Sequence, residues 1–178
     1  CLFLSATNVT RDGFKFDTTQ FISREKDELL GTGKLARGDI VITTRGTVGN
    51  IVHFDDNVAF SDIRINSGMV IIRSTHKGLD MEFLYCSLRN YVFLREYQRV
   101  VSGSAQPQLP IRDMKRFHCL MPPLLEQQLT VGRVALIDNR LGREEEFLAK
   151  LRQQKHGLMH DLLTGRVHVN INEVGVVQ

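Results

Sequence analysis

Apolar residues in the first two thirds of the chain come in short runs that Gly, Asn, Asp and Pro separate. This pattern is typical of strands joined by loops. Residues 44–47 read Thr-Arg-Gly-Thr, and we expect a turn there that makes residues 40–54 a hairpin. The strands that the pattern predicts are residues 2–6, 13–16, 39–43, 49–54, 62–65, 69–73 and 117–121.

Helical spacing replaces the short runs at residues 81–100. There the apolar residues recur three and four positions apart, which predicts a helix with one apolar face. A second, shorter helix is expected after Pro110, over residues 111–116. The apolar face of the first helix consists of Phe83, Leu84, Leu88, Val92 and Leu94.

The chain after Pro122 and Pro123 has a heptad repeat of apolar residues, which is typical of a coiled coil. Pro123 suits the first turn of a helix, and Gly165 is a C-terminal stop. A helix over residues 124–163 is about 60 Å long at ~1.5 Å per residue, too long to lie on the preceding domain along its whole length. The apolar a and d positions are Val134, Ile137, Leu141, Leu148, Leu151, Leu158 and Leu162, and the polar ones are Glu144 and Lys155.

Because the helix is too long for the domain to cover it, it needs a partner, either the same helix of a second copy or another part of a longer chain.

The change of pattern at Pro122 predicts an α+β fold, in which a mixed, strand-rich globular domain of residues 1–123 precedes a long helix of residues 124–165. Residues 166–178 are expected to be a tail.

Charge and composition exclude few classes of function. The formal net charge is +3, and the excess of basic residues lies in residues 1–123, because residues 124–178 carry equal numbers of basic and acidic residues. That excess permits binding to a polyanion without requiring it. The three cysteines predict neither a disulfide framework nor a metal site. Without a membrane-length apolar run or the basic flank of a signal peptide, we expect a cytoplasmic protein.

Four segments, in this order along the chain, resemble the specificity subunits of Type I restriction-modification enzymes. Residues 38–42 (GDIVI) and 45–49 (RGTVG) resemble the central hairpin of a target recognition domain, and residues 102–109 (SGSAQPQL) resemble a segment near its end. Residues 121–128 (MPPLLEQQ) are similar to the entry of the family's long helix, and residues 156–167 (HGLMHDLLTGRV) to its exit.

The resemblance implies a module that selects a DNA site and has no catalytic chemistry of its own. Its partners would be double-stranded DNA, the DNA methyltransferase subunits and, in the full complex, the restriction and motor subunit. A complete specificity subunit usually has two recognition domains and two long helices, which here predicts a half-subunit or a C-terminal portion. Two such domains on paired helices would read two short DNA segments, with the helices fixing the unread spacer.

The sequence offers no constellation for catalysis, a cofactor or a metal. An adenine methyltransferase needs Asn or Asp before Pro-Pro and an aromatic residue after it, but Met121 and Leu124 stand there. His156 and His160 lie four residues apart on the predicted helix without the acid that a zinc site of the His-Glu-x-x-His type requires. We therefore expect no enzyme activity, no cofactor and no metal.

Side chains that read base edges are expected in three segments, because Arg, Asn, Gln, Ser and Thr present the donors and acceptors that bases require. Arg45 is the leading candidate, while Gln106 is equally suited to bracing the junction between domain and helix. The candidates are Thr43, Thr44, Arg45, Thr47, Ser61, Arg64, Asn66, Ser67, Ser104, Gln106 and Gln108. Candidates for phosphate contacts are Lys15, Lys34, Arg37, Arg99 and Lys115.

Each candidate also has an ordinary structural interpretation, since Thr-Arg-Gly is a common hairpin tip and most surface Arg residues are simply solvated. An alternative function is a coiled-coil adaptor that binds another protein and no DNA. A basic surface that faces DNA would favour the first function, and a large exposed apolar patch on the globular domain would favour the second.

Overall fold

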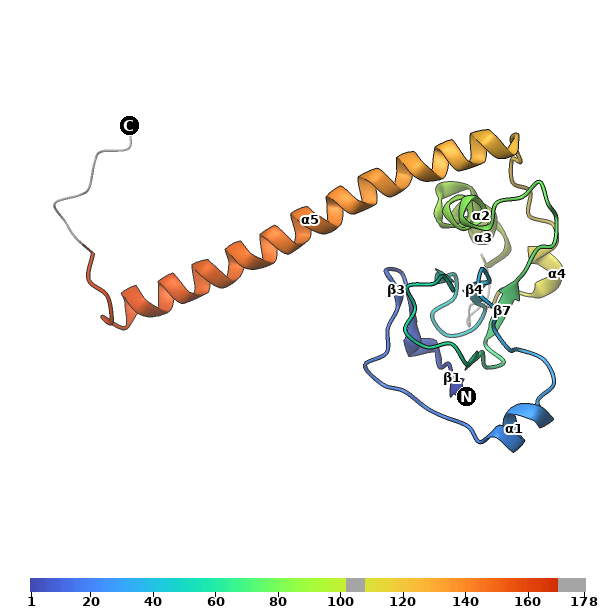
Figure 1. Cartoon of the computed structure of the whole chain (residues 1–178), viewed down its shortest axis with the longest axis horizontal. Helices are drawn as coiled ribbons and strands as arrows, with labels where there is room; N and C mark the ends of the chain where they lie inside the picture. Colours follow the sequence, from blue (N-terminus) through green and yellow to red (C-terminus); the bar gives the residue numbers. More distant parts are fainter. Residues whose placement is uncertain (102–107, 170–178) are drawn as a thin grey trace. The chain divides into compact units, whose positions relative to one another are not determined.

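The computed structural model describes residues 1–101 and 108–169. It divides into two compact units, residues 1–131 and residues 132–178. The first unit contains all the strands of the described part and the helices α1 to α4, and the long helix α5 begins within it (Figure 1).

A three-stranded antiparallel sheet with the order β5–β4–β7 forms the centre of the first unit. Its strands are β4 (Ile40–Thr43), β5 (Ile51–His53) and β7 (Met69–Ile72). Val41 lies opposite Val52 on one side and opposite Ile71 on the other. Branched residues favour this pleated, buried position, and the antiparallel β4–β5 pair confirms the predicted hairpin.

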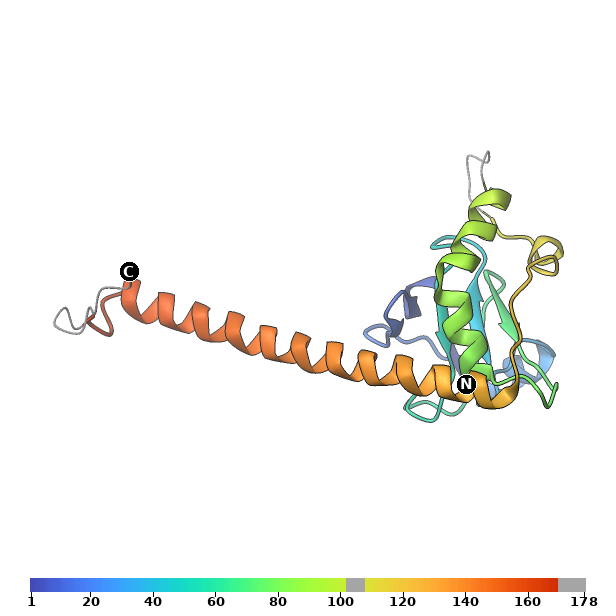
Figure 2. The ribbon, with the colours of Figure 1, turned by 90° about the horizontal axis from the view of Figure 1, so that it is seen from above.

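Two apolar clusters cover the two faces of this sheet, because successive side chains of a strand point to opposite faces. Ile40 and Ile42 belong to the cluster on the face where α2 and α3 pack (Figure 2), and Val41 belongs to the other. β4 is therefore buried on both sides. The first cluster consists of Ile40, Ile42, Ile51, Leu84, Phe93 and Leu109, and the second of Leu2, Leu4, Val9, Leu35, Val41, Val52, Phe54, Ile63 and Met69.

Short strands from the start of the chain complete the second cluster. A parallel pair joins β1 (Leu2–Phe3) to β6 (Ile63–Arg64), and a tight hairpin joins β2 (Val9–Thr10) to β3 (Gly13–Phe14). A single 3-10 turn (Ala6–Asn8) connects the two pairs. The predicted strands at these places are present, but each is shorter than the sequence pattern indicated.

Two helices stand where the sequence predicted one over residues 81–100. α2 (Met81–Arg89) ends at Asn90, whose backbone is extended, and α3 (Tyr91–Val101) begins directly afterwards. Asn favours such a position because it is a preferred residue at helix starts and a weak one inside helices. The break also changes the apolar face, since Phe93 is buried and Leu94 is exposed.

The remaining short helices are α1 (Arg24–Leu29) and α4 (Ile111–Met114). Ser23 caps α1, because its side chain accepts a hydrogen bond from the backbone N–H of Lys26. The strand predicted at residues 117–121 is wrong: the segment has no partner strand in the described part of the chain, and the side chain of Leu120 is 88% exposed.

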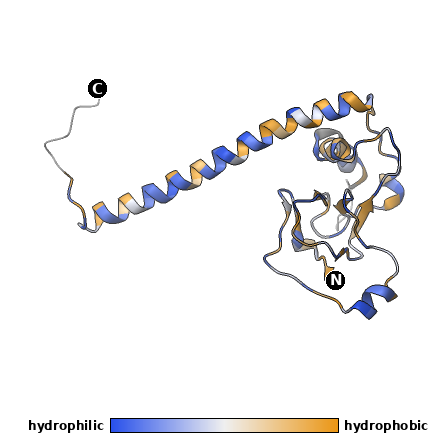
Figure 3. Ribbon diagram, viewed as in Figure 1, coloured by the Kyte–Doolittle hydropathy of each residue, from blue (hydrophilic) through white to orange (hydrophobic). Residues whose placement is uncertain are grey.

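Helix α5 (Leu124–Leu163) begins where Pro123 predicted a helix start and ends two residues before the limit of the helical segment expected over residues 124–165. Gly165 follows it with a φ of 71°, a left-handed conformation that glycine adopts without strain. Apolar and polar residues alternate along its whole length (Figure 3). Among the described residues, no helix combines the length and the apolar character that crossing a membrane requires.

Candidate nucleic-acid interface

The segments in which the sequence predicted base contacts meet at one end of the central sheet, where β4 ends and β7 begins. The backbone N–H groups of Thr44 and Arg45 both donate to the carbonyl of Gly68, at 2.7 and 3.2 Å. The N–H of Leu109 donates to the carbonyl of Thr44 at 3.1 Å. These bonds join the β4–β5 turn, the loop before β7 and the chain that leads into α4. We call this place the sheet-end surface; its side chains are those of Arg45, Thr47, Asn66, Ser67 and Gln108.

The turn that carries Arg45 has a fixed conformation. The hydroxyl of Thr43 donates to the carbonyl of Thr47, and its oxygen accepts from the N–H of Asn50 at 3.0 Å. Gly46 and Gly49 have φ angles of 74° and 88°, which a residue with a side chain adopts only under strain. The buried Thr43 thus shapes the turn on which the exposed Arg45 lies.

The side chains of the sheet-end surface are polar and accessible. Arg45, Thr47, Ser67 and Gln108 are exposed, while Asn66 is half-buried. The Oδ1 atom of Asn66 accepts a hydrogen bond from the N–H of Gly68 at 2.8 Å, which leaves its amide N–H groups to donate. Arg45 forms no ion pair with any residue that the structure describes. Together these groups present the donors that base edges accept.

Three predicted base contacts lie inside the fold instead. Thr43 and Thr44 are buried, and the side chain of Arg64 is 5% exposed. Arg64 donates to the carboxylate of Asp27 at 2.5 Å, to the backbone carbonyl of Asp27 at 2.8 Å and to the carbonyl of Thr32. A guanidinium used in this way braces α1 and the loop after it. The burial of these three side chains removes them from the surface that DNA could touch.

The residues predicted to contact phosphate differ in the protein groups that they already bind. Arg37 lies 4.2 Å from the centre of the Phe54 ring and donates to the carbonyls of Val58 and Phe60 at 3.0 and 3.2 Å. Its role is to tie loops to the core. Lys15 is exposed and pairs with Asp17 at 2.9 Å, which raises the pKa of its ammonium group.

Two further candidates are Arg99 and Lys115. Arg99 pairs with Glu96 at 2.8 Å within α3. Lys115 is exposed just after α4, without a described carboxylate partner. Ser61 is exposed before β6 and takes no part in the hydrogen bonds that define the sheet-end surface. Ser104 and Gln106 lie outside the described residues.

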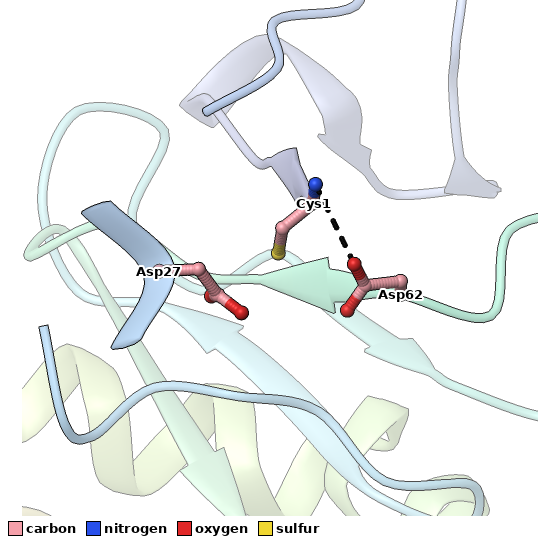
Figure 4. Close-up of side chains that lie close together, drawn as sticks. All are labelled: Cys1, Asp27 and Asp62. Carbon is pink, nitrogen blue, oxygen red and sulfur yellow. Dashed lines mark ion pairs between the residues drawn. The ribbon is translucent and has the colours of Figure 1, made fainter. Parts of the chain in front are cut away.

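Cys1, Asp27 and Asp62 lie close together (Figure 4), and Lys34 joins them in a compact charged cluster. Its ammonium contacts the carboxylates of Asp27 and Asp62 and lies 3.6 Å from the sulfur of Cys1. The hydrogen bond from Lys34, followed by that from Arg64, lowers the pKa of Asp27. The hydrogen bonds of Lys34 to Asp27 and Asp62 raise the pKa of its ammonium group. Since protein cations already satisfy the carboxylates, the cluster has no need of a metal ion to balance its charge.

Sequence analysis missed the role of Gln127, which is 0% exposed. Its Oε1 accepts from the N–H of Asp80 at 2.8 Å, and its Nε2 donates to the carbonyls of Gly78 and Pro122 at 2.8 and 2.7 Å. The first turn of α5 is thereby fastened to the start of α2. The signal was present in the sequence, because Gln127 is part of the segment PPLLEQ that resembles the family's helix entry.

The heptad positions of α5 are exposed over most of their surface. Leucines 141, 148, 151 and 158 are between 44% and 60% exposed, Val134 is 37% and Ile137 58% exposed, and Leu162 is half-buried. Leaving a row of large aliphatic side chains in water is unfavourable, at roughly 25 cal/mol per Å² of apolar surface. The row of a and d side chains, which we call the helix stripe, is thus a surface suited to a partner.

Comparison with known proteins agrees with this arrangement. The family described as "Type I restriction modification DNA specificity domain" matches residues 9–153. The chain belongs to this family. Two specificity subunits of Methanocaldococcus jannaschii are similar to it: the putative MjaX subunit is 26% identical over 74% of this chain, and the MjaVIII subunit 27% identical over 95%.

The chain spans only 29% and 40% of the lengths of those two relatives. The crystal structure of the HsdS subunit from Thermoanaerobacter tengcongensis shares its fold, with a TM-score of 0.64 and 18% identity over 89% of this chain and 40% of that one. As a specificity domain with a mixed α/β body and a long C-terminal helix, the protein has the fold that the resemblance predicted.

Proposed function

We propose that this specificity domain reads one half of a bipartite DNA target through the sheet-end surface. The observation that carries the proposal is the convergence of three polar segments, held by the backbone bonds of Thr44, Arg45 and Leu109. Arg45 has the form that recognises guanine, because its planar guanidinium can donate to both O6 and N7. Gln108 has an amide suited to adenine, and the N–H groups of Asn66 can donate to an acceptor on a base edge.

A selection of bound sequences from a pool of random DNA duplexes tests this reading surface. The Arg45→Ala variant is expected to lose about 1 to 3 kcal/mol of discrimination at one base pair and to keep the remaining preferences. Arg24→Ala is the matched control, because Arg24 is an exposed arginine on α1 that pairs only with Glu28 among the described residues. Unchanged preference at every base pair in the Arg45 variant would remove this residue from the reading surface.

The helix stripe supports a second part of the proposal: α5 pairs with an equivalent helix, either of a second copy or of the other half of a longer subunit. Paired helices would hold two recognition domains at a fixed separation and so define the unread spacer between the half-targets. In this arrangement the domain contributes recognition alone, and methyltransferase subunits and the restriction and motor subunit supply the chemistry.

The mass of the chain in solution, measured by light scattering over a concentration series, tests the pairing. A dimer that Leu148→Glu dissociates supports pairing between copies, since a buried charge at an a position is costly. Gln153→Glu places the same charge at an exposed position outside the stripe and should leave the dimer intact. A monomer at all concentrations would require the partner helix to come from a longer chain. A dimer that binds no DNA would instead favour the coiled-coil adaptor.

A further inference from the structure

Two arginines that sequence analysis did not select line one cleft of the first unit. Arg11 lies in the turn between β2 and β3, and Arg89 lies at the end of α2. The cleft has a volume of about 370 Å³. Its other lining residues are Asp12, Gly49, Ile51, Leu88, Phe93 and Leu94.

The guanidinium of Arg89 is held in place from two sides. It donates to the hydroxyl of Tyr85 at 3.1 Å and lies 5.3 Å from the centre of the Tyr85 ring. Its other terminal nitrogen donates to the backbone carbonyl of Arg11 at 3.0 Å. These bonds use two of its N–H groups and leave the others available. A guanidinium fixed in this way loses little entropy when it binds a phosphate through two hydrogen bonds.

The charge in the cleft is positive. Neither Arg11 nor Arg89 forms an ion pair with a carboxylate of the described residues. Asp12 is the acidic residue of the lining, and one carboxylate does not balance two guanidinium groups. In contrast, Lys15, Lys34 and Arg99 are all paired with carboxylates. The unpaired arginines therefore favour an anionic ligand.

The cleft adjoins the turn that carries Arg45. Gly49 lines the cleft and is also part of that turn, where its N–H donates to the carbonyl of Thr43 at 2.9 Å. One short turn thus has the base-reading candidate at its tip and the arginine cleft at its flank. A duplex that presents base edges to Arg45 has its sugar-phosphate backbone beside those edges, so a phosphate contact at the flank of the turn is compatible with base reading at its tip.

We propose that Arg11 and Arg89 bind a phosphate of the DNA backbone and so position the duplex against the sheet-end surface. This inference rests on the proposed DNA recognition and extends it. Contacts to phosphate carry no sequence information, so the cleft would set the register and the affinity of binding, and the sheet-end surface would set its specificity.

The salt dependence of DNA affinity separates these two roles. The full chain and its Arg11→Gln, Arg89→Gln and double variants are titrated with a random-sequence DNA duplex at several salt concentrations. Loss of one phosphate contact should reduce the slope of log affinity against log salt by roughly 0.9. The sequence preference, measured by selection, should not change. Arg24→Gln is the matched control and should retain the slope of the unchanged chain.

The outcomes distinguish the two proposals. If the unchanged chain binds DNA and the double variant keeps its full slope, the cleft is not a phosphate site, and the reading surface is unaffected. If the cleft variants change the sequence preference at single base pairs, the arginines read bases and the positioning role is wrong. Absence of DNA binding by the unchanged chain at low salt would refute the reading surface and the cleft together. Arg11→Gln serves alone if loss of the Arg89 bonds impairs folding, because the side chain of Arg11 has no described partner.

Discussion

Removal of the Gln127 side chain is expected to destabilise the first unit. Gln127→Ala leaves the N–H of Asp80 without its acceptor and the carbonyls of Gly78 and Pro122 without their donor. A buried polar group that loses its partner costs about 1 to 3 kcal/mol. Gly78 and Pro122 are only half-buried, so water can reach part of this region. We therefore expect a total loss of about 2 to 4 kcal/mol.

Urea unfolding followed by tyrosine fluorescence measures this effect, because Tyr85 and Tyr97 lie on α2 and α3. The variant should unfold at lower urea with an unchanged slope, which means a change of stability alone. Gln128→Ala is the matched control, since the neighbouring amide is exposed. Equal stability of the two variants, within about 0.5 kcal/mol, would refute the bracing role of Gln127.

Three further predictions concern single positions. Hydrogen bonds from Lys34 and Arg64 lower the pKa of Asp27, so its contribution to stability is present above its unfolded pKa of about 3.9 and is lost as the pH falls through its lower folded value. Asp27→Asn should reduce stability at neutral pH and flatten its decline with acid, which unfolding at several pH values measures; an equally steep decline would contradict this. Gly46→Ala should lower stability by about 1 kcal/mol, because φ is 74° there. Gly142→Ala within α5, where an added methyl group meets nothing within 4 Å, should raise helix stability by up to about 1 kcal/mol in thermal unfolding followed by circular dichroism.

Local patterns predicted the central hairpin and the long helix, because the residues that favour these elements lie within the elements themselves. The run Ile40–Thr43 has the branched residues of a strand buried on both faces, and the apolar heptad positions of α5 run from Val134 to Leu162. The prediction of a strand at residues 117–121 was wrong because a strand must pair with another strand. The residues of one segment do not show whether such a neighbour is present. The break between α2 and α3 at Asn90 was not predicted, because a single residue ends the helix inside an otherwise continuous apolar pattern.

The candidate site was harder to predict, because the role of an arginine depends on what lies within reach of its donors. Arg64 reaches Asp27, which is 37 residues away in sequence, and Arg89 reaches the backbone of Arg11 across 78 residues. No spacing rule relates such positions. The three polar segments of the sheet-end surface were chosen for side-chain type alone, and only the backbone bonds of the folded sheet bring Arg45 and Gln108 to the same place.

The number of donors already in use separates the arginines of this domain into two kinds. Arg37, Arg64 and Arg73 donate to backbone carbonyls or to a buried carboxylate, and each fastens a loop to the core. Their donors are satisfied within the chain, so a phosphate would have to displace protein partners to bind them. The side chains of Arg11 and Arg45 have no hydrogen-bond partner among the described residues. An arginine whose donors are used within the chain and an arginine that keeps free donors, as Arg89 does beyond its two hydrogen bonds, can look the same in the sequence. Only the second can exchange water for DNA without a loss elsewhere.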